Sequence, residues 1–152
     1  MKKIASLLLS SVLVFNVAFA QKEKDVALET IGAASGLLLY NTYLAIGTVS
    51  DAYAGQCYKA DVTTQLAQEQ INTAELLANQ YNLLLESGFL TDKDDKAFVT
   101  EIVLTFGYLK NEATYLKAFV ESGSDKDTKK YEDNRNEAWT RISKMLGLNE
   151  EK

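Results

Sequence analysis

The sequence predicts an all-α protein folded as an antiparallel, up-down-up-down four-helix bundle. Three observations support this prediction. The chain contains no proline, and no stretch alternates apolar and polar residues as a half-buried β-strand does. Glycine-containing breaks divide residues 21–152 into four segments whose apolar residues recur at steps of three and four, as on one face of a helix. Short connections between helices of similar length favour antiparallel neighbours.

Residues 1–20 have the layout of a secretory signal peptide. Lys2 and Lys3 precede an apolar run, and the segment ends in Ala18-Phe19-Ala20 before Gln21. Small residues at the end of such a run are typical of a signal-peptidase site. We therefore expect cleavage after Ala20, a mature bundle in residues 21–152, and a periplasmic or secreted location.

Helices are expected at about residues 24–54, 59–87, 92–121 and 125–146. The first three end next to Gly55, Gly88 and Gly123, and glycine is favoured just past a helix C-terminus. The segments 91–94 and 124–127 supply N-cap side chains and acidic first turns for the last two helices.

One stripe of each helix is expected to face the core, because its residues are separated by three or four positions. The four stripes, in chain order, are Leu28, Ile31, Ser35, Leu38, Thr42, Ile46, Val49 and Tyr53; Leu66, Gln70, Ala74, Leu77, Tyr81, Leu84 and Gly88; Phe98, Ile102, Phe106, Leu109, Ala113, Leu116 and Val120; Tyr131, Arg135, Ala138, Ile142 and Met145.

Thr30–Ser50 carries no charge and is long enough to cross a bilayer. Its strongly apolar residues favour insertion by only about 2–4 kcal/mol, and Asn41, three threonines and three glycines oppose it. The segment is followed by Asp51 rather than by the basic residues that flank a membrane helix. The sequence thus argues against a membrane span, with a membrane-associated subunit as the alternative.

The same segment has a second apolar stripe, opposite the core stripe, and the third helix repeats it more weakly. A helix that is apolar nearly all round is covered on both sides. We therefore predict an interaction face for an unknown protein partner or a second copy of the chain. The alternative is a wide core with scattered surface apolar residues. The predicted face comprises Leu37, Tyr40, Leu44, Leu104, Tyr108 and Tyr115.

Polar residues also interrupt the core stripes. Counting outward from the turns places Thr42, Gln70, Glu112 and Arg135 at one level of the bundle, with Tyr81 nearby. A forked guanidinium suits a carboxylate partner, so we expect Arg135 to pair with Glu112. The preferred interpretation is a layer that fixes helix register, as polar core residues do in coiled coils. The alternative is a pocket for a small anionic ligand.

Several functions are disfavoured by composition. The chain has no histidine, which removes the usual nucleophile–base pairs and histidine-bound metals or haem, and no phosphate-binding loop is present. We expect no catalytic residue, metal or cofactor. The net charge is −5, and −7 without Lys2 and Lys3, which disfavours nucleic acid as a partner. Cys57 is the only cysteine, so no intramolecular disulfide can form.

Overall fold

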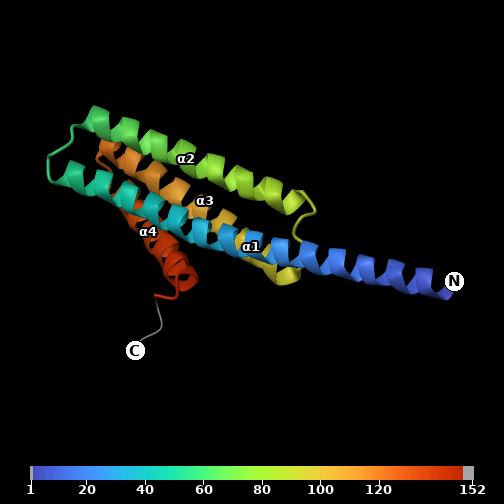
Figure 1. The fold of residues 1–152 in the computed structure, drawn as a ribbon. Coiled ribbons are helices and arrows are strands. Elements are labelled where there is room, and N and C mark those ends of the chain that lie inside the picture. The colour runs from blue at the N-terminus through green and yellow to red at the C-terminus, as the bar shows by residue number, and fades with distance from the viewer. Residues whose placement is uncertain (1, 149–152) are drawn as a thin grey trace. The chain divides into compact units, whose positions relative to one another are not determined.

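The computed structural model describes the backbone of residues 2–148 and the side chains of residues 22–148. Residues 2–148 form four helices and no strand, as Figure 1 shows. The helices are α1 (Lys2–Ala54), α2 (Ala60–Glu86), α3 (Lys93–Ser122) and α4 (Asp125–Met145). The all-helical class and the four helices agree with the prediction. The chain divides into two compact units at Ala34 and Ser35, and each unit is described by itself.

The start of α1 differs from the expectation. The helix was expected from about residue 24, but it begins at Lys2. The uncut chain has no glycine or proline before Gly32, so no residue of the strong helix-breaking types interrupts it. The predicted signal peptide, residues 1–20, lies outside the residues whose side chains are described. From Lys22 to Ala34 every side chain is exposed or half-buried, including the expected core residues Leu28 and Ile31.

The helix ends follow the expected chemistry with two differences. One is Ser124, which stands at the N-cap of α4 as expected but whose side chain makes no capping hydrogen bond. Gly88 and Gly123 adopt left-handed conformations, with φ of 77° and 66°. At the first break it is Gln56, not Gly55, that takes a positive φ, of 57°. The side chain of Asp92 caps α3 by accepting hydrogen bonds from the backbone N–H groups of Asp94 and Asp95, with N···O distances of 2.7 and 3.4 Å.

In the unit from Ser35 onward, α3 lies against both α2 and α4, as Figure 1 also shows. It buries nine residues, including Ile102, Phe106 and Leu109, whereas α2 buries only Thr63, Ala67 and Ala74. Small residues on α2 allow its backbone to approach its neighbours closely. α3 is therefore the helix around which the core is built.

Three expected core residues are exposed, namely Gly88 in the turn after α2 and two residues with large side chains. Leu38 and Phe98 lie at the surface, and their neighbours Leu39 and Val99 are buried instead. Either residue of each pair keeps the three-or-four spacing with the rest of its stripe, so spacing alone does not separate them.

Among the residues with described side chains, no helical segment is both long enough and apolar enough to cross a membrane, and these residues include Thr30–Ser50.

Candidate functional site

The predicted partners Glu112 of α3 and Arg135 of α4 meet inside the bundle. The Glu112 side chain is 0% exposed, and Nη1 of Arg135 donates a hydrogen bond to its Oε1 at 2.7 Å. The same Nη1 is 3.4 Å from the carbonyl oxygen of Tyr43 on α1, to which it also donates. Oε2 of Glu112 has no hydrogen-bond partner among the described residues. Side chains from α3 and α4 and the backbone of α1 thus meet at one ion pair, whose carboxylate is buried and whose arginine is partly exposed.

α1 shapes the space that the guanidinium occupies. The Cζ of Arg135 lies 4.0 Å from the centre of the Tyr43 ring, within the range of a cation–π contact. A Cβ atom at Gly47 would lie 2.5 Å from Nη2 and 2.8 Å from Nη1 of Arg135. The absence of a side chain at Gly47 therefore lets the guanidinium pack directly against the backbone of α1.

Burial dominates the electrostatics of this site. It raises the pKa of Glu112 from an ordinary value of 4.5 to about 7, against the lowering effect of the hydrogen bond and charge of Arg135. Burial alone would lower the pKa of Arg135, but its bond to Glu112 and the nearby tyrosines outweigh burial and raise it. Burial also raises the pKa values of Tyr43 and Tyr131. Glu112 is therefore the group of this site that titrates near neutral pH.

Replacement of Gly47 with alanine is expected to lower the free energy of unfolding by about 1–2 kcal/mol, despite the higher helix propensity of alanine. The new methyl group would push the guanidinium off its place, and Arg135 would have to move away from Glu112. Urea unfolding followed by circular dichroism measures the change. Gly107→Ala is the matched control, because a Cβ there meets nothing within 4 Å. It should stabilise by about 0.5–1 kcal/mol, and equal stabilisation by both changes would contradict this role of Gly47.

The other expected members of the polar layer are engaged elsewhere. The hydroxyl of Thr42 donates to the carbonyl of Leu38 at 2.8 Å. The hydroxyl of Tyr81 is 2.6 Å from that of Ser35, and its ring stacks on Phe106. Within the described chain, no hydrogen bond connects Gln70, which is half-buried, to the ion pair. The layer is therefore centred on Glu112 and Arg135 alone.

The level expected for Gln70 was about one helical turn away from the observed one. Gln68 accepts a hydrogen bond from Lys117, and Glu75 forms an ion pair with Lys110. These two contacts place Gln70 level with about Tyr115, beyond Glu112. The expected level was obtained by counting equal numbers of residues along both helices from Leu90, in the middle of the connection. The actual connection between α2 and α3 shifts this register by a few residues.

Sequence reasoning did not assign Tyr43, Gly47 or Tyr131 to this site. Tyr43 covers the guanidinium, and Tyr131 stands close enough to interact with the charges of Glu112 and Arg135. One signal was available for Gly47. A glycine inside a helix costs about 0.5–1 kcal/mol relative to alanine, so it calls for a packing reason. No pattern in the sequence indicated that an arginine supplies that reason.

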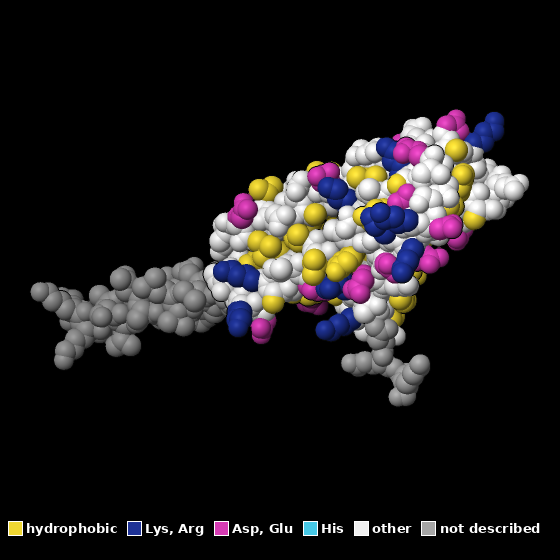
Figure 2. All heavy atoms as spheres, turned by 180° about the vertical axis from the view of Figure 1, so that it is seen from behind, with side chains coloured by type: hydrophobic (Ala, Val, Ile, Leu, Met, Phe, Trp, Pro, Cys, Tyr) yellow, Lys and Arg dark blue, Asp and Glu magenta, His cyan; other side chains and the backbone are white. Residues whose placement is uncertain are grey.

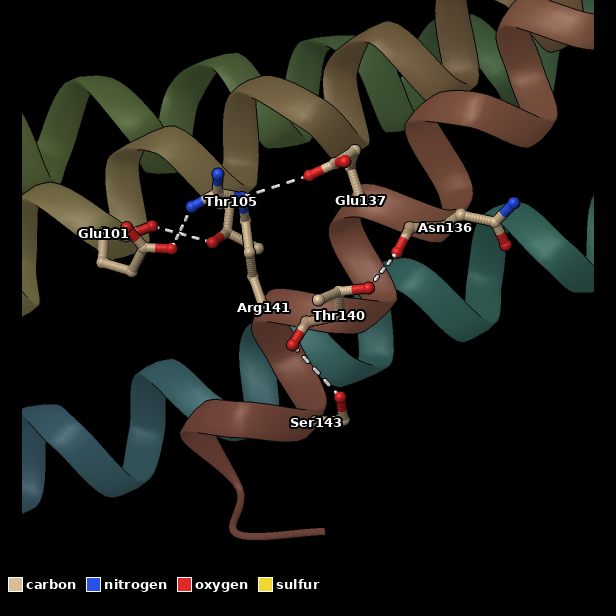
Figure 3. A network of polar contacts seen from close by, with 7 residues as sticks. All are labelled: Glu101, Thr105, Asn136, Glu137, Thr140, Arg141 and Ser143. Atoms are coloured by element: carbon tan, nitrogen blue, oxygen red, sulfur yellow. Dashed lines mark hydrogen bonds and ion pairs between the residues drawn. The ribbon is translucent and has the colours of Figure 1, made fainter. Parts of the chain in front are cut away.

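A second arginine–glutamate pair joins the same two helices, as Figure 3 shows. Arg141 of α4 forms an ion pair with Glu101 of α3, and its Cζ lies 4.9 Å from the centre of the Tyr108 ring. Arg141 and Glu101 both remain partly exposed, unlike Glu112. Each arginine of α4 thus pairs with a glutamate of α3 and contacts a tyrosine ring. This second pair was not predicted.

The predicted interaction face divides into two kinds of residue. Leu37, Leu44 and Leu104 are exposed. The three tyrosines are half-buried against partners in the same chain: Tyr40 against Trp139, Tyr108 against Arg141 and Tyr115 against Lys130. On the face drawn in Figure 2, apolar side chains gather in patches along the helices, with charged side chains between them.

The ion pair is buried at Glu112, while the Arg135 side chain is 27% exposed. The guanidinium that could bind an anion already donates to Glu112 and to Tyr43. In the described part of the chain, no group of three or more acidic or sulfur-containing side chains is placed to hold a metal ion. Comparison of the chain with known proteins finds no matching family model, no matching curated protein and no matching solved structure.

Proposed function

We propose that the chain is exported after cleavage following Ala20 and acts without catalysis, by binding another protein through the outer faces of α1 and α2. We propose a second copy of the chain as the first partner to test. The signal-peptide layout of residues 1–20 supports export. The acidic, histidine-free composition supports a binding role over an enzymatic one.

One observation carries the binding proposal. Leu37 and Leu44 on α1 are 61% and 42% exposed, and Leu76 and Leu83 on α2 are 59% and 58% exposed. Each pair is separated by seven residues, the repeat with which one helix presents a continuous seam to another. Single exposed leucines are ordinary, but a pair with this spacing on each of two consecutive helices is a feature that helical partners commonly cover.

We infer an antiparallel, up-down-up-down order for the four helices, supported by contacts along α2, α3 and α4. On α2 and α3, Gln68 meets Lys117 while the later Glu75 meets the earlier Lys110. On α3 and α4, the pairs Glu112–Arg135 and Glu101–Arg141 follow the same reversed order. Reversed order in successive contacts is the signature of neighbouring helices that run in opposite directions.

The Glu112–Arg135 pair serves this function indirectly, as a structural element that sets the register of α1, α3 and α4. Nη1 of Arg135 already donates to Glu112 and to the carbonyl of Tyr43, and the Glu112 carboxylate beside it is fully buried, which favours a structural role over a pocket for an anionic ligand.

Sedimentation velocity of residues 21–152 at micromolar concentration tests the proposal. We expect a dimer or larger species that becomes a monomer when Leu37→Glu and Leu44→Glu are combined, because buried charges oppose association. The thermal midpoint of the monomer should hardly change, since both leucines lie at the surface.

The control combines Asn111→Glu with Thr114→Glu, which adds the same charge at two exposed positions of α3. This variant should associate as the parent chain does. A parent chain that stays monomeric, with stability and solubility unaffected by the leucine changes, would end the hypothesis.

A further inference from the structure

A pocket lies where α1 turns into α2, apart from the Glu112–Arg135 pair and from the exposed leucines. Its volume is about 640 Å³, which falls within the range of small-molecule sites in proteins, roughly 300–1,000 Å³. Tyr53 of α1, Tyr58 of the connection and Phe119 of α3 line it, together with Gln56 and Lys59. Three aromatic side chains from three separate segments thus line one open pocket.

Backbone hydrogen bonds fix the shape of this pocket. The N–H groups of Cys57 and Tyr58 both donate to the carbonyl of Ala52, at 2.8 and 3.0 Å. Gln56 holds a left-handed conformation with φ of 57°, which costs a residue with a side chain about 1–2 kcal/mol. Such strained residues gather at binding sites, where surrounding structure maintains them. The wall that carries Tyr58 and Lys59 is therefore formed before any ligand arrives.

The rings also have a defined arrangement. The rings of Tyr53 and Phe119 meet edge to face, with their centres 6.3 Å apart and their planes at 87°. Aromatic side chains supply flat apolar surface, which suits a planar ligand. Tyr58, which also lines the pocket, is 39% exposed.

The charge at the pocket favours a ligand of negative charge. Lys59 is the only charged residue among those that line it. Within the described chain, its ammonium group forms no ion pair, in contrast to Lys110 and Lys117. A carboxylate on the ligand would give this ammonium a partner. We propose that the pocket binds a small aromatic carboxylate, with the rings holding its planar part and Lys59 its charge.

The test is titration of the full chain with 2-naphthoate, followed by amide shifts in nitrogen–proton NMR spectra. We expect saturable binding, with the largest shifts in residues 50–60 and at Phe119. The uncharged analogue 2-naphthamide should bind more weakly to the parent chain. Lys59→Gln should weaken binding of the naphthoate about threefold to fivefold, as for a solvent-exposed ion pair, and leave binding of the amide unchanged. Tyr58→Ala should weaken binding of both compounds.

Lys126→Gln is the matched control, because Lys126 is another exposed lysine beside the start of a helix, α4. It should change neither affinity. Absence of saturable naphthoate binding, shifts centred away from the pocket, or equal loss with Lys126→Gln and Lys59→Gln would overturn the proposal. If Tyr58→Ala does not fold, the comparison of the two lysine variants, both at exposed positions, still decides it.

Discussion

Arg135→Met at pH 8 is expected to lower the free energy of unfolding by about 3–5 kcal/mol, the usual cost of removing one partner of a buried ion pair. The change leaves the Glu112 carboxylate fully buried, and the guanidinium supplies its one hydrogen bond among the described residues. Urea unfolding followed by circular dichroism measures the loss.

A double replacement distinguishes the interaction between Arg135 and Glu112 from the contribution of their packing to stability. Combining Arg135→Met with Glu112→Leu should recover most of the stability, because two apolar side chains leave no buried charge without a partner. Arg141→Met is the matched control on the same helix. Its partner Glu101 is partly exposed, so Arg141→Met should lower the free energy of unfolding by about 1 kcal/mol or less. Losses at Glu112 and Arg135 that simply add would show that the two residues do not interact.

The second large effect is a dependence of stability on pH that arises from Glu112. Burial raises the pKa of this carboxyl in the folded chain to about 7, above its ordinary value of 4.5. The folded state therefore holds the proton more tightly than the unfolded state does. Between these two values, raising the pH removes a proton that stabilises the fold, so stability should fall with rising pH and level off above pH 7.

The expected loss between pH 5 and pH 8 is about 2.5 kcal/mol from this group alone. Glu112→Gln is the comparison, because the amide can still accept a hydrogen bond from Arg135 but does not titrate. The difference between the parent chain and this variant, measured by urea unfolding at pH 5, 6, 7 and 8, isolates Glu112 from the other carboxylates. A difference that stays constant over this range would place the pKa of Glu112 at its ordinary value.

The parts of the fold that depend on local chemistry could be predicted from the sequence. The left-handed glycines at the ends of α2 and α3 and the cap at Asp92 are set by residues a few positions apart. Pairing of Arg135 with Glu112 was predictable as well, because a charge in the middle of an apolar stripe requires a partner and the short α3–α4 turn fixes which residues are level.

Features set by contacts between distant helices could not be predicted in this way. Leu39 is buried where Leu38 was expected, and which of the two faces the core depends on the orientation of α1 about its own axis. The position of Gln70 depends on the shape of the α2–α3 connection, which spacing does not define. Three tyrosines that were predicted to lie on the surface instead pack against Trp139, Arg141 and Lys130. These contacts depend on which side chains of one helix are long enough to touch another, and the spacing of residues along one helix does not show this.

The attachment of α4 has a consequence for the exposure of Glu112 to water. This helix buries Ala138, Ile142 and Ser143, and two of its arginines pair with glutamates of α3. Local openings that separate α4 from α3 would break both ion pairs at once. Such an opening should expose the otherwise fully buried carboxylate of Glu112 to water, so its proton should exchange only when α4 moves.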